Sequence, residues 1–146
     1  MNPILKKSKK EDYKELAEIY KIEFSKPPYN EPWTKKKAIE KIKFLEDYCD
    51  LYSVFYEKKI VGFIALNPTK FMPGKFVEGE EFCISEKFQN KGIGKFCIEY
   101  LKKIYKKKGF QELLFIVLRK SKAYKIYKRL GYLESKSEAI FVKRLK

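Results

Sequence analysis

Six residues in the second half of the chain have the spacing of an anion-binding loop. The segment Gln89-Asn90-Lys91-Gly92-Ile93-Gly94 follows a run of strand-forming residues and leads directly into a helical pattern. Glycines between a strand and a helix let the backbone turn tightly, and they point several amide N–H groups at one spot beside the positive end of the helix dipole. The motif therefore predicts a pyrophosphate site, although the spacing alone fits a plain strand-to-helix turn equally well.

Two other glycine-loop motifs do not fit these residues. A Walker A loop requires glycine at position 89 and serine or threonine at position 96, where the chain has Gln89 and Phe96. A dinucleotide fingerprint that starts at Gly92 requires glycine or alanine at position 97, where the chain has Cys97. Both alternatives fail at positions that they require.

The sequence contains no histidine, and this limits the chemistry available to it. Ser-His-Asp and Cys-His nucleophilic systems are excluded, as are zinc sites that use histidine. The three cysteines, Cys49, Cys83 and Cys97, have no CxxC spacing, and no apolar signal segment is found among the first ten residues. We predict a cytoplasmic protein without a metal, which moves protons with Glu, Asp, Tyr, Lys or Cys.

The net charge of +15 raises the possibility of a nucleic-acid partner. However, 31 of the 34 basic residues are lysines spread along the chain, whereas bidentate recognition of phosphate or guanine favours arginine. A lysine-rich composition is therefore the preferred interpretation, and a small basic nucleic-acid-binding domain remains the alternative. The longest apolar run, residues 113–118, is too short to cross a bilayer.

The remaining patterns predict one α/β domain over residues 1–146, in which strands and helices alternate. Ser8 and Glu11 have the spacing of a capping box for a first helix that ends at Pro27. Thr34 is expected to cap a second helix. The aromatic, proline-rich connection between these helices suggests a binding wall that contains Tyr29 and Trp33, or else a plug of the core. Strands are expected at 4–5, 51–56, 60–66, 77–85, 113–118 and 139–142. Further helices are expected after the glycine loop, with an inner face from Phe96 to Ile104 and an end near Gly109, and at about 121–130.

Two segments carry a resemblance to a known family. Residues 80–95, EEFCISEKFQNKGIGK, resemble the strand, acyl-CoA loop and following helix of the GNAT superfamily of CoA-dependent N-acyltransferases. Residues 123–132, AYKIYKRLGY, resemble the second signature of that family, a helix that ends in Tyr-x-x-Leu-Gly-aromatic. The order of the expected elements is also that of the family, so the resemblance covers essentially the whole chain.

The resemblance implies a fold and a cosubstrate. The fold class is α/β of the α+β type, a single GNAT-like domain. Its mixed, mostly antiparallel sheet of about six to seven strands is splayed in a V between the fourth and fifth strands and is flanked by about four helices. Acetyl-CoA would lie in this gap. By resemblance, backbone groups around Ile84 and Ser85 pair with the pantetheine, and the pyrophosphate is held by the amides of Gln89, Asn90, Lys91, Gly92, Ile93, Gly94 and Lys95.

The resemblance also implies proton donors and acceptors. Tyr127 matches the tyrosine that protonates the departing CoA thiolate, and its phenol suits that role. The chain departs from the family at Lys120, where many members have asparagine, so no role is carried over to Lys120. An acceptor amine is almost wholly protonated at neutral pH and requires a carboxylate base. Strand alternation would send Glu80 and Glu81 to opposite faces, so that only one faces the acceptor.

We favour Glu80 as the base and place Glu81 second; the alternative is that both are solvated charges at the start of a strand. A route through an acetyl-cysteine at Cys83 is conceivable, but without a histidine to activate the thiol we expect Cys83 to be a packing residue.

The sequence thus predicts an acetyl-CoA-dependent N-acetyltransferase that acts by direct attack in a ternary complex. An inactive CoA-binding relative is the close variant. The expected partners are acetyl-CoA and an amine acceptor, which could be a small molecule, an amino acid, an antibiotic or a protein N-terminus. No membrane association is expected, and the protein is expected to be a monomer or a homodimer.

Overall fold

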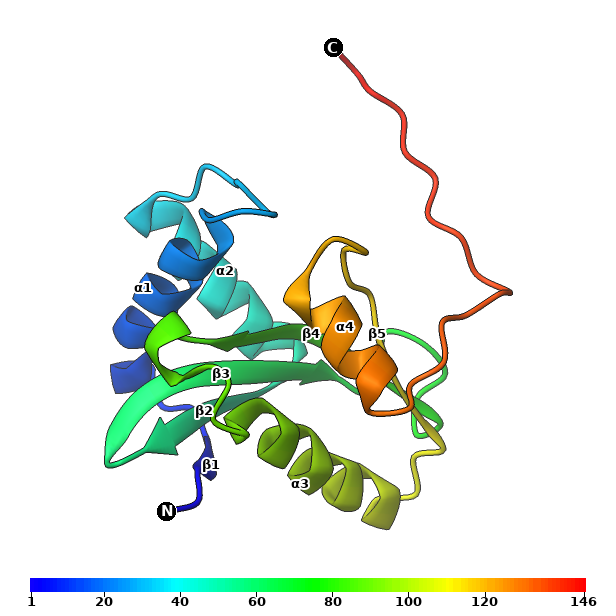
Figure 1. Cartoon of the computed structure of the whole chain (residues 1–146), viewed down its shortest axis with the longest axis horizontal. Coiled ribbons are helices and arrows are strands. Elements are labelled where there is room, and N and C mark those ends of the chain that lie inside the picture. The colour runs from blue at the N-terminus through cyan, green and yellow to red at the C-terminus, as the bar shows by residue number, and fades with distance from the viewer. The chain divides into compact units, whose positions relative to one another are not determined.

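The computed structural model describes all residues from Met1 to Lys146. The chain divides into two compact units, Met1–Ile116 and Val117–Lys146, and each is described by itself. The first unit is built on a five-stranded sheet in the order β1-β2-β3-β4-β5 (Figure 1). Its strands are β1 (Ile4–Lys7), β2 (Asp50–Tyr56), β3 (Lys59–Asn67), β4 (Phe76–Ile84) and β5 (Glu112–Phe115). Neighbouring strands are antiparallel except β4 and β5, which are parallel, so the expected mixed, mostly antiparallel sheet is confirmed.

Helices cover both faces of this sheet (Figure 1). On one face lie α1 (Tyr13–Phe24) and α2 (Lys35–Tyr48), whose buried side chains form a core with Leu51, Phe63 and Ala65. On the other face lies α3 (Ile93–Lys107), which buries Cys97 and Leu101 among others. Alternate strand residues point to opposite faces, and the strands are apolar on both faces because each face is covered.

The start of the first helix differs from the expected capping box. The Lys9 N–H donates to Asp12 Oδ2 at 2.9 Å, and a short 3-10 helix, Lys10–Asp12, precedes α1. Ser8 is not available for capping because its hydroxyl lies 2.7 Å from that of Ser53 on β2. The cap of α2 is as expected, since the Lys37 N–H donates to Thr34 Oγ1 at 3.2 Å.

The pairing of β5 with β4 covers only half of β4. Phe76 to Gly79 pair with Glu112 to Phe115, and no strand continues along this edge from Glu80 to Ile84. The phenyl ring of Phe115 packs directly over Gly79, where a Cβ would overlap it. Half of β4 is therefore left without a neighbouring strand, on the side of the fifth strand, where the gap was expected.

The second unit contains α4 (Lys122–Arg129). Ser121 caps this helix by accepting from the Tyr124 N–H at 3.2 Å. The helix ends at Gly131, whose φ of +85° is in the left-handed region, and the Tyr132 N–H donates back to the Tyr127 carbonyl at 2.9 Å. The expected helix at about 121–130 is therefore confirmed, which brings the number of α-helices to four.

The sheet has five strands, fewer than the six to seven expected. Residues 139–142 are not a strand but extended chain, in which the side chains of Ile140, Phe141 and Val142 are exposed. A strand requires a hydrogen-bonded neighbour, and the second unit offers none because its only regular element is α4. Alternation and β-branched residues alone were therefore insufficient to form a strand here.

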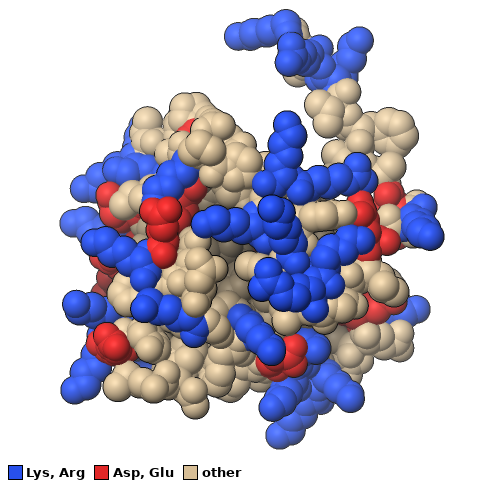
Figure 2. Space-filling model, in the orientation of Figure 1, with Lys and Arg blue, Asp and Glu red and all other residues tan.

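Basic side chains are scattered over the visible face of the molecule, with carboxylates among them (Figure 2). They do not gather into a single stripe on this face. None of the four helices combines the length and the apolar character that crossing a membrane requires.

Candidate functional site

The loop between β4 and α3 presents unpaired amides. Gly92 is the N-cap of α3 and has a φ of +78°, and Asn90 is also left-handed, with a φ of +60°. The first amide of the helix with a backbone partner is that of Phe96, which donates to the Gly92 carbonyl at 3.0 Å. Helix geometry leaves the three preceding amides, those of residues 93–95, without an intrahelical acceptor. These amides lie at the positive end of a 15-residue helix and are suited to an anion.

Of the two glycines in the motif, only Gly92 needs the backbone freedom of glycine. Gly94 lies in the first turn of α3 in a helical conformation, and a Cβ there would be 3.7 Å from the Phe82 ring, an ordinary contact distance. Asn90 and Gly92 therefore make the tight turn. Gly94 has no side chain, so no Cβ covers that position in the first turn of the helix.

Gln89 ties the loop to the end of β4. Its side-chain Nε2 donates to the Ile84 carbonyl at 2.7 Å and to Glu23 Oε1 on α1 at 3.3 Å. Its own amide donates to the Glu86 carbonyl at 3.1 Å, so this amide is already used in the turn. The sequence indicated that Gln89 belongs to the loop, but not that its side chain holds the loop in place.

The open edge of β4 offers backbone groups between Glu80 and Ile84. The Ser85 N–H points inward and donates to the Val61 carbonyl of β3 at 2.8 Å. Because backbone groups along a strand alternate in direction, Ile84 and Phe82 direct theirs away from β3, toward the edge that β5 leaves open. Of the two residues expected to bind pantetheine, Ile84 directs its N–H to the open edge, but its carbonyl already accepts from Gln89 Nε2. The Ser85 amide is already hydrogen-bonded to β3.

A β-bulge at Glu80 changes the expected orientation of the carboxylates. Ala65 of β3 pairs with Glu81 and the next residue, Leu66, pairs with Gly79, so that Glu80 is the extra residue. The side chain of Glu81 contacts α1 and α2, and that of Glu80 contacts Asn67, which follows Ala65 on the same face of β3. The expectation that the two side chains point to opposite faces is wrong, because the bulge interrupts the alternation.

Glu81 is largely buried between α1 and α2. Its Oε1 accepts from the Tyr20 hydroxyl at 3.3 Å and lies 3.4 Å from the Lys41 ammonium. Burial raises the pKa of Glu81, and the two donors oppose this rise only in part. A raised pKa makes a carboxylate a stronger base toward an ammonium. Tyr20 lies on the buried face of α1, and helical spacing by itself gives no sign of its contact with Glu81.

Glu80 shares a second cluster with Glu78, Asn67 and Lys70. The Lys70 ammonium lies 3.0 Å from Glu78 Oε1 and 3.4 Å from Glu80 Oε1. The Asn67 side-chain amide donates to Glu80 Oε1 at 3.3 Å. Glu78 is only 2% exposed, and burial raises its pKa. The positions of Glu78 and Lys70 could not be predicted from the sequence, because only the strand register brings them to Glu80.

The aromatic residues between α1 and α2 extend from the Glu81 cluster. The Trp33 ring meets that of Tyr20 edge-on, with centroids 4.7 Å apart, and the Tyr29 ring lies 4.6 Å from that of Phe24. The chain folds back here because the Glu31 N–H donates to the Phe24 carbonyl at 3.0 Å. Trp33 therefore packs against the core and also lies one ring away from the residue that contacts Glu81.

Cys83 is a packing residue in this structure. Its thiol lies in the core beneath α1 and α2, and burial raises its pKa well above the ordinary value. A thiol that ionises so poorly is a weak nucleophile. The Cys83 thiol is therefore poorly suited to nucleophilic attack.

Tyr127 lies on α4 in the second unit. It is 8% exposed, and its ring packs edge-on against that of Tyr132, with centroids 5.3 Å apart. Its backbone carbonyl accepts the hydrogen bond that ends the helix. The helix end at Gly131, two residues after Arg129, therefore fixes the position of Tyr127 within its unit.

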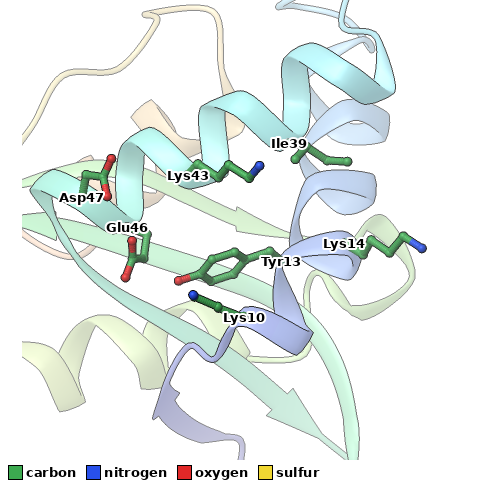
Figure 3. Close-up of a pocket in the computed structure, with 7 residues that line it drawn as sticks. All are labelled: Lys10, Tyr13, Lys14, Ile39, Lys43, Glu46 and Asp47. Carbon is green, nitrogen blue, oxygen red and sulfur yellow. The ribbon is translucent and has the colours of Figure 1, made fainter.

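A hollow of about 540 Å³ lies elsewhere, on the outer side of α1 and α2 (Figure 3). Its walls include Tyr13 and Ile39, with Lys10, Lys43 and Glu46 around them. Burial and the neighbouring Glu46 raise the pKa of the Tyr13 phenol. None of the residues of β4 or of the glycine loop lines this hollow, so it contains no part of the predicted site.

The comparisons with known proteins agree on one protein family. Residues 13–132 match the model of the acetyltransferase (GNAT) family. An uncharacterised N-acetyltransferase of Chlorobaculum tepidum is 27% identical over 103 residues. The aligned residues are 70% of this chain and 61% of that protein, so the chain matches only about three fifths of its relative's length.

Two solved structures share the fold. A possible acetyltransferase from Clostridium difficile has a TM-score of 0.81 at 14% identity and covers 100% of both chains. PaiA N-acetyltransferase from Thermoplasma acidophilum, solved in complex with coenzyme A, has a TM-score of 0.73 at 22% identity and covers 94% of both chains.

Proposed function

Because the chain belongs to the GNAT acetyltransferase family, we propose that it transfers an acetyl group from acetyl-CoA to a primary amine. The donor would bind with its pantetheine arm along the open edge of β4 and its pyrophosphate at the start of α3. The related Thermoplasma protein, whose structure contains coenzyme A, supports this choice of cosubstrate.

One observation carries the proposal. The edge of β4 from Glu80 to Ile84 has no neighbouring strand, and after the turn at residues 85–92 it is followed by unpaired amides at the N-terminus of α3. An extended strand edge suits the amides of a pantetheine arm, and the helix terminus suits a pyrophosphate at the end of that arm. Acetyl-CoA combines these two groups in this order.

The proposed reaction is direct attack by the amine on the thioester carbonyl. Glu80 accepts the proton of the acceptor ammonium, directly or through water, and Glu81 is the second candidate for this role. Both side chains lie on the same face of β4 beside the bulge, at the residues where the open edge begins. The neutral amine then forms a bond to the carbonyl carbon, and the bond between that carbon and sulfur breaks.

Tyr127 is proposed as the acid that protonates the CoA thiolate. This role rests on the match of residues 123–132 to the second signature of the family. A phenol with a pKa of about 10 can donate a hydrogen bond and then its proton to the sulfur as the negative charge develops there. Full transfer to a thiolate whose conjugate acid has a pKa of about 8.5 is uphill by only about 2 kcal/mol. Tyr29 and Trp33 are proposed to border the acceptor. We further propose a cytoplasmic protein that is a monomer or a homodimer and uses no metal.

A thermal-shift measurement with acetyl-CoA tests the donor. A ligand at a hundred times its Kd stabilises the folded state by about 2.7 kcal/mol, which for a chain of this size raises Tm by several degrees. We expect the rise in Tm to follow the logarithm of the acetyl-CoA concentration. No rise at millimolar acetyl-CoA would refute the proposal.

A further inference from the structure

Lys70 is held in position by a hydrogen bond of its backbone N–H and by ion pairs of its ammonium group. It lies in the loop between β3 and β4, where its N–H donates to Asn67 Oδ1 at 3.0 Å. The same Asn67 oxygen accepts from the backbone and hydroxyl of Thr69 at 3.0 and 3.2 Å, which fixes the start of the loop. The loop thereby turns the Lys70 side chain back toward β4, although 40% of that side chain remains exposed.

The Lys70 ammonium occupies the place where an acceptor amine is required. It lies 3.4 Å from Glu80 Oε1, close to the distance over which a carboxylate can take a proton from an amine. Glu80 is also the bulge residue at which the edge of β4 becomes open, and the thioester is proposed to lie along that edge. A primary amine, a base and the start of the donor site therefore coincide at Glu80.

Of the 31 lysines, one other forms an ion pair with a β4 glutamate. Lys41 lies 3.4 Å from Glu81 Oε1, but it extends from α2 and its ammonium lies over the Phe44 ring, 5.5 Å from the centroid. Its position is thus fixed by a helix and an aromatic ring. Lys41 provides a control of the same residue type at the same distance from a carboxylate.

We propose that Lys70 is an acetylation site of the protein itself, modified in cis by the acetyl-CoA bound at β4. This inference rests on the proposed function. The Lys70 ammonium gives one proton to Glu80, and the nitrogen lone pair forms a bond to the thioester carbonyl carbon. The bond between carbon and sulfur then breaks, the thiolate takes up a proton, and the nitrogen loses its second proton. Overall, an ammonium and a thioester give an amide, a thiol and one released proton.

The product differs from the starting state in charge. Acetylation removes the cation between Glu78 and Glu80, so that both carboxylates lose an ion pair. Glu80 is then available to an ammonium from solution. The modification therefore removes the protein's own lysine ammonium from Glu80 and leaves this carboxylate accessible to an external acceptor amine.

The experiment is peptide mapping by mass spectrometry after incubation of the full chain with isotopically labelled acetyl-CoA. We expect the label at Lys70 before any other lysine, at a rate that does not depend on protein concentration. Lys70 that is already fully acetylated with unlabelled acetyl after purification would also support the proposal. Equal labelling of the exposed lysines, or labelling of Lys41 first, would overturn it.

Three variants separate this transfer from chemical acetylation. Lys70→Arg should carry no label at position 70 and should still be stabilised by acetyl-CoA, while Lys41→Arg should label Lys70 as the wild type does. Glu80→Gln should lower the rate at Lys70 by at least about tenfold, because a general base contributes more than this. An unchanged rate in Glu80→Gln would overturn the proposal.

The same experiment distinguishes this inference from the proposed function. If acetyl-CoA stabilises the protein and an external amine is acetylated while Lys70 stays unlabelled, only the inference is overturned. If acetyl-CoA neither stabilises the protein nor donates to any amine, both are overturned.

Discussion

The two glycines of the loop should respond to alanine in opposite ways. Gly92 is the left-handed N-cap of α3, with a φ of +78°, and no atom lies near the position of an added Cβ. Gly94 lies in the first helical turn, where a Cβ would make an ordinary contact with Phe82. Gly92→Ala and Gly94→Ala therefore add the same methyl group to two neighbouring sites that differ in backbone conformation.

The magnitudes follow from that conformation. An L-residue in the left-handed region costs about 1–2 kcal/mol, and the smaller conformational freedom of the unfolded chain returns about 0.4–1 kcal/mol. Gly92→Ala should therefore lower the free energy of unfolding by about 0.8 kcal/mol, and by no more than about 1.6 kcal/mol. Gly94→Ala should leave it unchanged or raise it by up to about 1 kcal/mol, because alanine is favoured over glycine in a helix.

Ligand binding provides the second readout. Gly94 lies among the amides that are proposed to bind the pyrophosphate, so that the added methyl group of Gly94→Ala would narrow the space beside them. We expect its affinity for acetyl-CoA to fall by about tenfold or more, which corresponds to about 1.4 kcal/mol, although the fold is not weakened. Urea unfolding gives the stability and calorimetric titration gives the affinity. The reasoning is refuted if Gly94→Ala destabilises the protein as much as Gly92→Ala, or if it binds acetyl-CoA as tightly as the wild type.

Three further predictions concern the acid, the base and the pH dependence of stability. Tyr127→Phe should lower kcat and leave the affinity for acetyl-CoA nearly intact; an unchanged kcat in steady-state assays would exclude Tyr127 as the acid. Tyr20→Phe removes a hydrogen bond that lowers the pKa of Glu81, so the acidic limb of the pH–rate profile should move to higher pH if Glu81 is the base and should stay in place if Glu80 is the base. Because the pKa of Glu81 is higher in the folded state than its ordinary value of 4.5, the unfolded state binds fewer protons above that pH. The free energy of unfolding of the wild type should therefore fall relative to that of Glu81→Gln as the pH rises from about 4.5. Urea unfolding of both proteins across this pH range measures the difference. A difference that stays constant, or that grows in favour of the wild type, would contradict the prediction.

Local patterns were sufficient for most of the fold. Helical patterns predicted α1 and α3, since each helix buries one stripe of its residues, which includes Leu16 in α1 and Leu101 in α3. Thr34 and Gly131 marked helix ends correctly because a cap depends on only a few neighbouring residues. The strand expected at 139–142 was wrong because a strand depends on a distant partner, which the composition of the segment does not reveal.

In the candidate site, too, features that depend on neighbouring residues could be predicted, whereas features that depend on residues distant in the sequence could not. The left-handed turn at Gly92 follows from its own motif. The bulge at Glu80 depends on the register between β3 and β4, so strand alternation gave the wrong faces for Glu80 and Glu81. Lys70 was missed for a related reason, since its contacts with Glu78 and Glu80 exist only once the sheet has formed.

The most direct test of the account is identification of the product. Acetyl-CoA is incubated with the protein and a panel of amines, amino acids, polyamines, aminoglycosides and peptides with free N-termini, and thiol release is followed together with the mass of each acceptor. We expect at least one acceptor to gain an N-acetyl group in an amount equal to the CoA released, at a rate that falls in Glu80→Gln or Glu81→Gln. If no amine in the panel causes release of CoA above the rate without acceptor, the central claim is contradicted.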